Sequence, residues 1–185
     1  FRLAHVVYGR EIIEVATFRA NSDDGSGDRE QDQEGRVLRD NVYGSIEEDA
    51  VRRDFTANAL YYAISDFSVR DYVGGFEDVN NRVMKLIGDP ETRYREDPVR
   101  MLRAVRLAAK LRFTIDPESA ERIPELASLL QEASSARLFE ETLKLFLSGH
   151  AEASFLGLEA HGLLAGLLPE TAAALASNRS GALRR

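Results

Sequence analysis

The 185-residue chain contains no cysteine, which excludes disulfides, thiol catalysis and zinc sites built on thiolates. No apolar run approaches the ~20 residues that a membrane-spanning helix needs, and the start of the chain does not read as a signal peptide. Three histidines are scattered without the spacing of a metal site. The glycine-rich motifs of dinucleotide and P-loop sites and the G-x-S-x-G motif of serine hydrolases are also missing. We therefore expect a cytoplasmic protein with no membrane partner.

Positive charge is in the minority, because 24 Lys and Arg oppose 31 Asp and Glu and the net charge is −7. A globally basic DNA-coating protein is therefore excluded, DNA is not expected as a partner, and any nucleic-acid surface has to be local. Hydrophobic residues make up 44% of the chain, enough for a folded core. The chain begins with Phe1 instead of Met and enters a strand-like pattern at once, so we expect it to be an internal piece of a longer protein.

The first part of the chain, residues 1–88, predicts mixed α and β structure. β-branched and aromatic residues dominate Leu3–Tyr8 and Ile12–Phe18, which flank a short turn and predict an antiparallel hairpin. Residues 20–36 are almost all polar, many of them acidic, and cannot bury enough surface to become ordered. We expect a flexible acidic loop there, which is also what an ordinary solvated linker would look like.

Helix and strand signals follow this loop. Ser45 and Glu48 have the spacing of a capping box and predict a helix start. Helical spacing of apolar residues predicts a further helix over residues 54–64. Residues 69–73 predict a strand that ends at two glycines, with residues 83–87 as its possible partner.

The second part, residues 89–185, predicts helices only. Three Asp-Pro pairs each place an N-cap acceptor before a proline suited to a first helical turn: Asp89-Pro90, Asp97-Pro98 and Asp116-Pro117. Four apolar stripes at helical spacing follow, and the small polar residues 177–185 are expected to fray. The fold class is therefore α+β, with an all-helical second domain.

One segment reverses the charge balance of the whole chain. Residues 93–112 hold seven Lys or Arg and two acids, a local charge of about +5. At a predicted helix start, Asp97 lies three residues before Arg100 and Glu96 lies four residues before it. A carboxylate and the guanidinium can therefore project side by side and form hydrogen bonds with the edge of a base. Further basic residues on this flank could receive RNA phosphates: Arg103, Arg106, Lys110 and Arg112. The alternative is an ordinary surface helix with local salt bridges.

Two further groups of charged residues are candidates. Arg52 and Arg53 precede Asp54 at a predicted helix start, where two adjacent arginines suggest a nearby anion. They could equally pair with the acids at 47–49. Glu14 is a lone carboxylate in an apolar strand, so it is a candidate catalytic or metal-binding group or simply a solvent-facing residue.

Several motifs occur in series, and together they resemble one family. They are Glu14–Arg19, Leu38–Ala50, Arg52–Thr56 (Arg-Arg-Asp-Phe-Thr), Asp71–Gly75 and Glu96–Arg103 (Glu-Asp-Pro-Val-Arg-Met-Leu-Arg). The chain closely resembles the bacterial poly(A) polymerases of the class II nucleotidyltransferases, a group shared with CCA-adding tRNA enzymes. The resemblance runs from Phe1 to about Pro169, and residues 38–56 and 136–144 favour the poly(A) polymerase branch over CCA addition.

The resemblance implies the C-terminal part of a polymerase-β-like nucleotidyltransferase head over residues 1–88, followed by a helical neck and RNA-binding body. It implies that Glu96, Asp97 and Arg100 contact the base of the incoming nucleotide, with Arg103 beside them in the pocket. It associates the motif at residues 52–56 with the ribose and triphosphate and makes Asp54 an active-site acid. The implied activity is the addition of AMP from ATP to RNA 3′ ends, as in mRNA polyadenylation, by in-line transfer with Mg²⁺.

The family's metal-binding Asp-x-Asp pair precedes the point where this chain begins, and no equivalent string occurs in it. Glu14 could offer at most a third carboxylate to the metal, so we expect these 185 residues alone to be inactive. Two other interpretations stay open. One is a CCA-adding enzyme, and the other is a non-catalytic RNA-binding module. Partners from RNA decay are not identifiable from the sequence.

Overall fold

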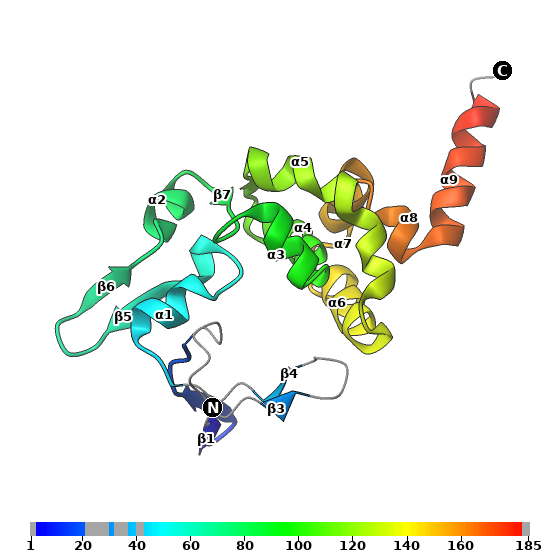
Figure 1. Cartoon of the computed structure of the whole chain (residues 1–185). Coiled ribbons are helices and arrows are strands. Elements are labelled where there is room, and N and C mark those ends of the chain that lie inside the picture. The colour runs from blue at the N-terminus through cyan, green and yellow to red at the C-terminus, as the bar shows by residue number, and fades with distance from the viewer. Residues whose placement is uncertain (1–2, 21–29, 32–36, 40–42, 183–185) are drawn as a thin grey trace. The chain divides into compact units, whose positions relative to one another are not determined.

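The computed structural model describes residues 3–20, 30–31, 37–39 and 43–182. The chain divides into two compact units, drawn with their elements in Figure 1. The N-terminal unit comprises Phe1–Arg53 and Ala59–Val73, and the helical unit comprises Asp54–Asn58 and Gly74–Arg185. Five residues of the Arg-Arg-Asp-Phe-Thr region therefore belong to the helical unit, although their neighbours on both sides do not. The predicted domain boundary at residue 88 stays a prediction.

The N-terminal unit is built from short hairpins and one helix. The predicted first hairpin is confirmed, because β1 and β2 pair antiparallel in an unbroken register and turn at Gly9, whose φ is +63°. The capping box is also confirmed, since Ser45 accepts a hydrogen bond from the backbone N–H of Glu48, and Glu48 accepts one from the backbone N–H of Ser45. The elements are β1 (Leu3–Tyr8), β2 (Glu11–Ala16), β3 (Glu30–Gln31), β4 (Val37–Arg39), α1 (Ile46–Val51), β5 (Leu60–Ala63) and β6 (Ser68–Asp71).

The predicted flexible loop over residues 20–36 falls mostly outside the described residues. Within the described part, Ala20 is buried, and β3 pairs antiparallel with β4.

The predicted helix over residues 54–64 is wrong. Thr56–Asn58 form one 3₁₀ turn, and Leu60–Ala63 form strand β5, which pairs with β6. Long-range backbone hydrogen bonds take the place of helical ones, because the N–H of Thr56 donates to the carbonyl of Lys85 and the N–H of Ile87 donates to that of Asp54. Tertiary pairing has overridden a local apolar spacing.

The strand expected at residues 69–73 is present as β6, but its proposed partner is wrong. Strand β7 (Val83–Met84) pairs in parallel with β8 (Thr114–Ile115), and β6 pairs with β5. The β7 partner lies 31 residues away in sequence, a pairing that local pattern does not encode.

Helices form most of the helical unit, and α4 packs against α3, α6 and α7 (Figure 1). Its buried side chains, among them Met101, Leu102 and Val105, join the apolar core of this unit. The elements are η2 (Thr56–Asn58), α2 (Gly75–Asn80), β7, α3 (Pro90–Glu96), α4 (Val99–Leu111), β8, α5 (Pro117–Leu126), η3 (Ala127–Glu132), α6 (Ser135–Leu147), α7 (Ala151–Ala160), α8 (Leu164–Leu167) and α9 (Pro169–Ala182).

Helix starts follow the Asp-Pro prediction in two cases of three. Asp89 and Asp116 cap α3 and α5, each with proline in the first turn. Asp97 instead ends α3, and α4 begins two residues later at Val99, although the Asp97 carboxylate still accepts the Val99 N–H at 3.2 Å. The residues expected to fray from Ser177 are helical as far as Ala182, where α9 ends, and the fraying itself stays a prediction.

Of the helices in the described part of the chain, none combines the length and the apolar character needed to cross a membrane.

Candidate functional site

Asp54 is held in place by the backbone around it. Its neighbour Phe55 is fully buried in the helical core and forms a β-bridge with Leu86. Thr56 is also buried and donates its hydroxyl to Asp78 of α2 at 2.7 Å. The Asp54 carboxylate therefore rests on a segment fixed by apolar burial on one side and polar contacts on the other.

Arg103 of α4 forms an ion pair with this carboxylate. Its Nε and Nη2 donate to Oδ2 of Asp54 at 2.7 and 2.5 Å, and the amide of Asn58 donates to Oδ1 at 2.9 Å. Burial raises the pKa of Asp54, but the hydrogen bond from Asn58 and the charge and hydrogen bonds of Arg103 outweigh it, so the pKa lies below its usual value. The structure thus joins two predicted site residues that are 49 positions apart.

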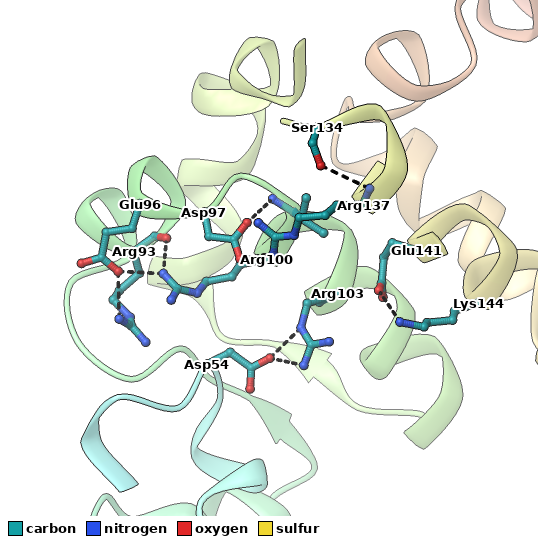
Figure 2. Close-up of polar contacts among 11 residues, drawn as sticks. Asp54, Arg93, Glu96, Asp97, Arg100, Arg103, Ser134, Arg137, Glu141 and Lys144 are labelled. Carbon is teal, nitrogen blue, oxygen red and sulfur yellow. Dashed lines mark hydrogen bonds and ion pairs between the residues drawn. The ribbon is translucent and has the colours of Figure 1, made fainter. Parts of the chain in front are cut away.

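A second cluster joins α3 to the start of α4. Oε2 of Glu96 accepts hydrogen bonds from Nη1 of Arg93 and Nη1 of Arg100, both at 2.8 Å. The Nη1 of Arg100 also donates to the carbonyl of Arg93 at 2.7 Å. Burial and then the charge of Arg100 lower the pKa of Arg93, against the opposing charges of Glu96 and Asp54. Figure 2 shows these side chains grouped with Asp54 and Arg103.

Asp97 has a different partner from the one that sequence spacing suggests. Arg100 pairs with Glu96, while Oδ2 of Asp97 accepts a hydrogen bond from Nη2 of Arg137 on α6 at 2.6 Å (Figure 2). The hydrogen bond to Asp97 raises the pKa of Arg137 against the opposing effect of burial, and the charge of Asp97 adds to the rise. Helix α6 thus fixes the carboxylate that lies between α3 and α4.

The predicted RNA-binding residues separate into two kinds. Arg106 is nearly buried and forms an ion pair with Glu141 of α6, whose side chain is also buried. Lys144 contacts the other oxygen of Glu141 at 3.6 Å (Figure 2). Lys110 and Arg112, at the end of α4, are exposed. The geometry makes Arg106 part of the α4–α6 contact and leaves Lys110 and Arg112 accessible to a phosphate.

In the N-terminal unit, Arg53 pairs with Asp49. Its Nε and Nη2 donate to Oδ2 of Asp49 at 3.1 and 2.9 Å, so one of the three acids considered as partners from the sequence is in contact. The helix α1 and the residues after it thereby place Arg52 and Arg53 beside the end of β2, with which they line one cavity.

Glu14 is exposed on the hairpin, where its carboxylate lies 3.5 Å from Nε2 of His5 on the paired strand. Within the described ranges, no three His, Cys, Asp or Glu side chains form a group that could hold a metal ion. The described residues therefore do not by themselves fit a magnesium site.

Sequence reasoning missed Arg137, which lies 40 residues from Asp97. It considered Asp49 as a partner of the arginines, but not that Asp49 also accepts hydrogen bonds from positions 19 and 61. Only the i,i+4 spacing of Asp49 and Arg53 could have been found locally. The others depend on tertiary packing.

Two family models match the chain. Residues 1–85 match the "Poly A polymerase head domain", and residues 112–175 match the "Probable RNA and SrmB- binding site of polymerase A". The motifs at residues 52–56 and 71–75 lie within the first match, and Arg137 and Glu141 lie within the second.

Curated relatives agree with these models. The chain is 55% identical over 188 aligned residues to poly(A) polymerase I of Salmonella typhi, covering all of this chain and 40% of that protein. It is 41% identical over 146 residues to the CCA-adding enzyme of Bacillus subtilis, covering 79% of this chain and 34% of that protein. The chain thus spans about two fifths of the length of the poly(A) polymerase that it matches.

Solved structures share the fold. A tRNA nucleotidyltransferase complexed with a primer tRNA and an incoming ATP analog superposes with a TM-score of 0.73 at 26% identity, over 90% of this chain and 44% of that one. The expected α+β class and the nucleotidyltransferase head are confirmed. The chain belongs to the poly(A) polymerase family of nucleotidyltransferases.

Proposed function

We propose that the protein carrying this chain is a template-independent adenylyltransferase, which adds AMP from ATP to RNA 3′ ends in the bacterial cytoplasm. Greater identity to a poly(A) polymerase than to a CCA-adding enzyme supports the choice of branch. The single observation that carries the proposal is the pair of anchored groups at the α3–α4 junction, Asp97 held by Arg137 and Arg100 held by Glu96.

These two anchored groups have the chemistry to read a base. Among the described residues, none accepts a hydrogen bond from Nε or Nη2 of Arg100, so its outer donors are available to a ring nitrogen or carbonyl. Each oxygen of Asp97 has one partner and a second lone pair, which can accept from an exocyclic amino group. Protein groups held in this way can select a base without a template strand, because their positions are fixed before the nucleotide binds.

Asp54 and Arg103 have complementary roles in the proposal. The lowered pKa keeps Asp54 ionised at neutral pH, so it can accept a hydrogen bond from a ribose hydroxyl. Arg103 balances the charge of that carboxylate, so the pair presents no net negative charge to the nucleotide. Arg52 and Arg53 are proposed to bind its phosphates, and Glu14 remains a proposed auxiliary carboxylate.

RNA is the proposed acceptor, bound by the helical unit. The family model over residues 112–175 is described as an RNA-binding site, and a structural neighbour holds a primer tRNA. Lys110 and Arg112 are exposed cations that can contact the phosphate backbone. Arg106 is proposed to act on RNA only through the α4–α6 packing, because its guanidinium is engaged by Glu141.

Primer extension by the complete protein tests the proposal. The protein is given Mg²⁺ and either ATP or CTP, with a generic RNA or a tRNA lacking its CCA end. We expect long adenylate tails on the generic RNA and little use of CTP. Addition of C, C and A confined to the tRNA would support the CCA-adding alternative. Binding of RNA with no nucleotide addition would support a non-catalytic RNA-binding module.

A further inference from the structure

Helices α4 and α7 pack closely against each other, and a cavity of about 320 Å³ is bounded by them and by β8. A Cβ at Gly157 of α7 would lie 2.7 Å from Cγ1 of Val105 on α4, so glycine allows this close approach. The cavity lies entirely within the helical unit. Small-molecule pockets span about 300–1,000 Å³, so this volume suits one planar ring system better than a whole nucleotide.

The lining of this cavity is mostly apolar. Among the described residues that form it, none is Asp, Glu, Lys or Arg. One face of α4, the residues after α4 and one face of α7 contribute, among others, Val105, Ala108, Phe113, Ile115, Ala153 and His161. Phe113 and His161 have flat rings of the kind on which a nucleobase can stack.

The backbone after α4 fixes Phe113 beside the cavity. Arg112 ends the helix with a left-handed φ of +58°, which turns the chain. The N–H of Phe113 then donates to the carbonyl of Ala108 at 3.0 Å. The next residue, Thr114, donates its N–H to the carbonyl of Arg82 at 2.9 Å. Phe113 is half-buried, so the fold positions its ring while part of the ring stays accessible.

His161 supplies a hydrogen-bonding ring to the cavity. It follows the last residue of α7, and its N–H donates to the carbonyl of Gly157 at 3.1 Å. Among the described residues, none forms a hydrogen bond with its imidazole. Burial lowers the pKa of His161, so at pH 7 the neutral ring offers one N–H donor and one acceptor nitrogen. The edge of a nucleobase carries donors and acceptors side by side, which such a ring can meet.

Exposed cations stand at the end of α4 next to the cavity. By helical spacing, Arg112 continues the stripe of Val105 and Ala108, which lie seven and four positions before it and line the cavity. Lys110 is exposed on the same last turn. No carboxylate of the described residues forms an ion pair with either cation. A phosphate attached to a base in the cavity would therefore meet an available positive charge.

We propose that this cavity binds one unstacked base of the RNA acceptor, with the base against Phe113 and His161 and its phosphate in contact with Arg112. The inference rests on the proposed function and extends it, because six of the nine lining residues lie within residues 112–175, to which that proposal assigns RNA. An apolar side chain of a protein partner would use the apolar walls but neither the imidazole nor the cations. A nucleotide of RNA uses all three, since it stacks, forms hydrogen bonds and carries a phosphate.

The test measures binding of RNA to the complete protein in the absence of ATP, so that no catalysis is needed. The probe is a fluorescently labelled oligoadenylate in which an abasic site replaces one base at a time. We expect one position at which loss of the base raises the Kd about tenfold, the order of one base stacked on aromatic side chains.

Ala153→Leu fills the cavity from an exposed position of α7. It should raise the Kd of the intact oligoadenylate by a similar factor and remove the sensitivity to the abasic site. His161→Phe keeps a flat ring without its hydrogen-bonding nitrogens and should raise the Kd about threefold.

Ala160→Leu is the matched control, because Ala160 is also exposed on α7 but does not line the cavity. The RNA affinity of this variant should not change. RNA binding without a sensitive position in the unsubstituted protein, or a sensitivity that persists in Ala153→Leu, would overturn the inference.

Calorimetry with AMP separates a second source of the same chemistry. AMP binding that Ala153→Leu weakens, together with RNA binding that it leaves unchanged, would assign the cavity to a free nucleotide and overturn the inference. Either negative result would leave the adenylyltransferase proposal standing, since primer extension tests that proposal separately.

Discussion

The two units hold their functional side chains by different means. In the helical unit, Asp54 and Arg103 stand on segments whose neighbours Phe55 and Leu102 are fully buried. In the N-terminal unit, every residue of β1 and β2 is exposed, and Arg53 is held by the polar cluster around Asp49. Apolar packing thus positions Asp54 and Arg103, whereas hydrogen bonds to the buried carboxylate of Asp49 position Arg53.

The difference predicts opposite sensitivities. Loss of an apolar core group costs transfer free energy and leaves a cavity, so the helical unit should respond to volume changes. The polar cluster should respond to loss of charge with little change in volume. Substitutions that change volume in the helical unit and substitutions that change charge in the N-terminal unit therefore test the comparison.

The largest effect is expected for Phe55→Ala. Phe55 is fully buried in the helical core, so its removal should lower the free energy of unfolding by about 3–5 kcal/mol. Urea denaturation of the chain measures the change. A loss below about 1 kcal/mol would mean that this segment is not anchored by the core, and the comparison between the units would fail.

A second prediction separates the buried and exposed cations of α4. Arg106→Ala should destabilise the fold by about 3 kcal/mol, because it leaves the buried Glu141 without its main partner. Lys110→Ala should leave stability unchanged within about 0.5 kcal/mol and reduce the salt dependence of RNA binding by about one phosphate contact. Denaturation and RNA titrations across ionic strength measure both. The reverse pattern, a stable Arg106→Ala variant with a flatter salt dependence, would return Arg106 to the RNA surface.

Acid should weaken both units through their anchored carboxylates. The pKa of Asp49 and of Asp54 is lowered in the folded state from a reference value of 3.8. A lowered carboxyl pKa contributes stability that is fully present above the unfolded pKa and is lost as pH falls through the folded value. The urea midpoint should therefore be flat near neutral pH and fall below about pH 4. If the urea midpoint of Asp54→Asn falls less steeply with pH, the difference measures the contribution of Asp54. An unchanged midpoint down to pH 2.5 in the unsubstituted chain would contradict the ion-pair account.

The smallest effect is expected on the hairpin. Val7 and Ile12 face each other across β1 and β2 and are 69% and 61% exposed, so Val7→Ser and Ile12→Ser should each change the stability of this chain by less than about 0.5 kcal/mol. Thermal unfolding of the two variants beside the unsubstituted chain is the measurement. A loss comparable to that of Phe55→Ala would show that the hairpin is packed in solution.

The sequence predicted correctly those elements that are determined by residues close to one another in the chain. The first hairpin, the Ser45 capping box and the caps at Asp89 and Asp116 all depend on residues within a few positions of one another. The helix predicted over residues 54–64 failed because the backbone of that segment pairs with residues 85–87, some 30 positions away.

The candidate site divides in the same way. The salt bridge of Glu96 with Arg100 follows from i,i+4 spacing, and so does that of Asp49 with Arg53. The contacts of Asp97 with Arg137 and of Asp54 with Arg103 join residues 40 and 49 positions apart, which only tertiary packing brings together. The resemblance to family motifs identified Asp54, Asp97 and Arg103 as site residues, but it did not predict which residues they contact.

The central claim is that Arg100 selects the base, and the ATP-to-CTP preference of the complete protein tests it most directly. Arg100→Ala is compared with Arg95→Ala, whose exposed arginine forms an i,i+4 salt bridge with Glu91 on α3. The account predicts that Arg100→Ala reduces the preference for ATP about tenfold or more in a protein that still folds, while Arg95→Ala leaves the preference and the melting temperature unchanged. An unaltered preference in a folded Arg100→Ala protein would contradict the account and reduce the cluster to a structural salt bridge.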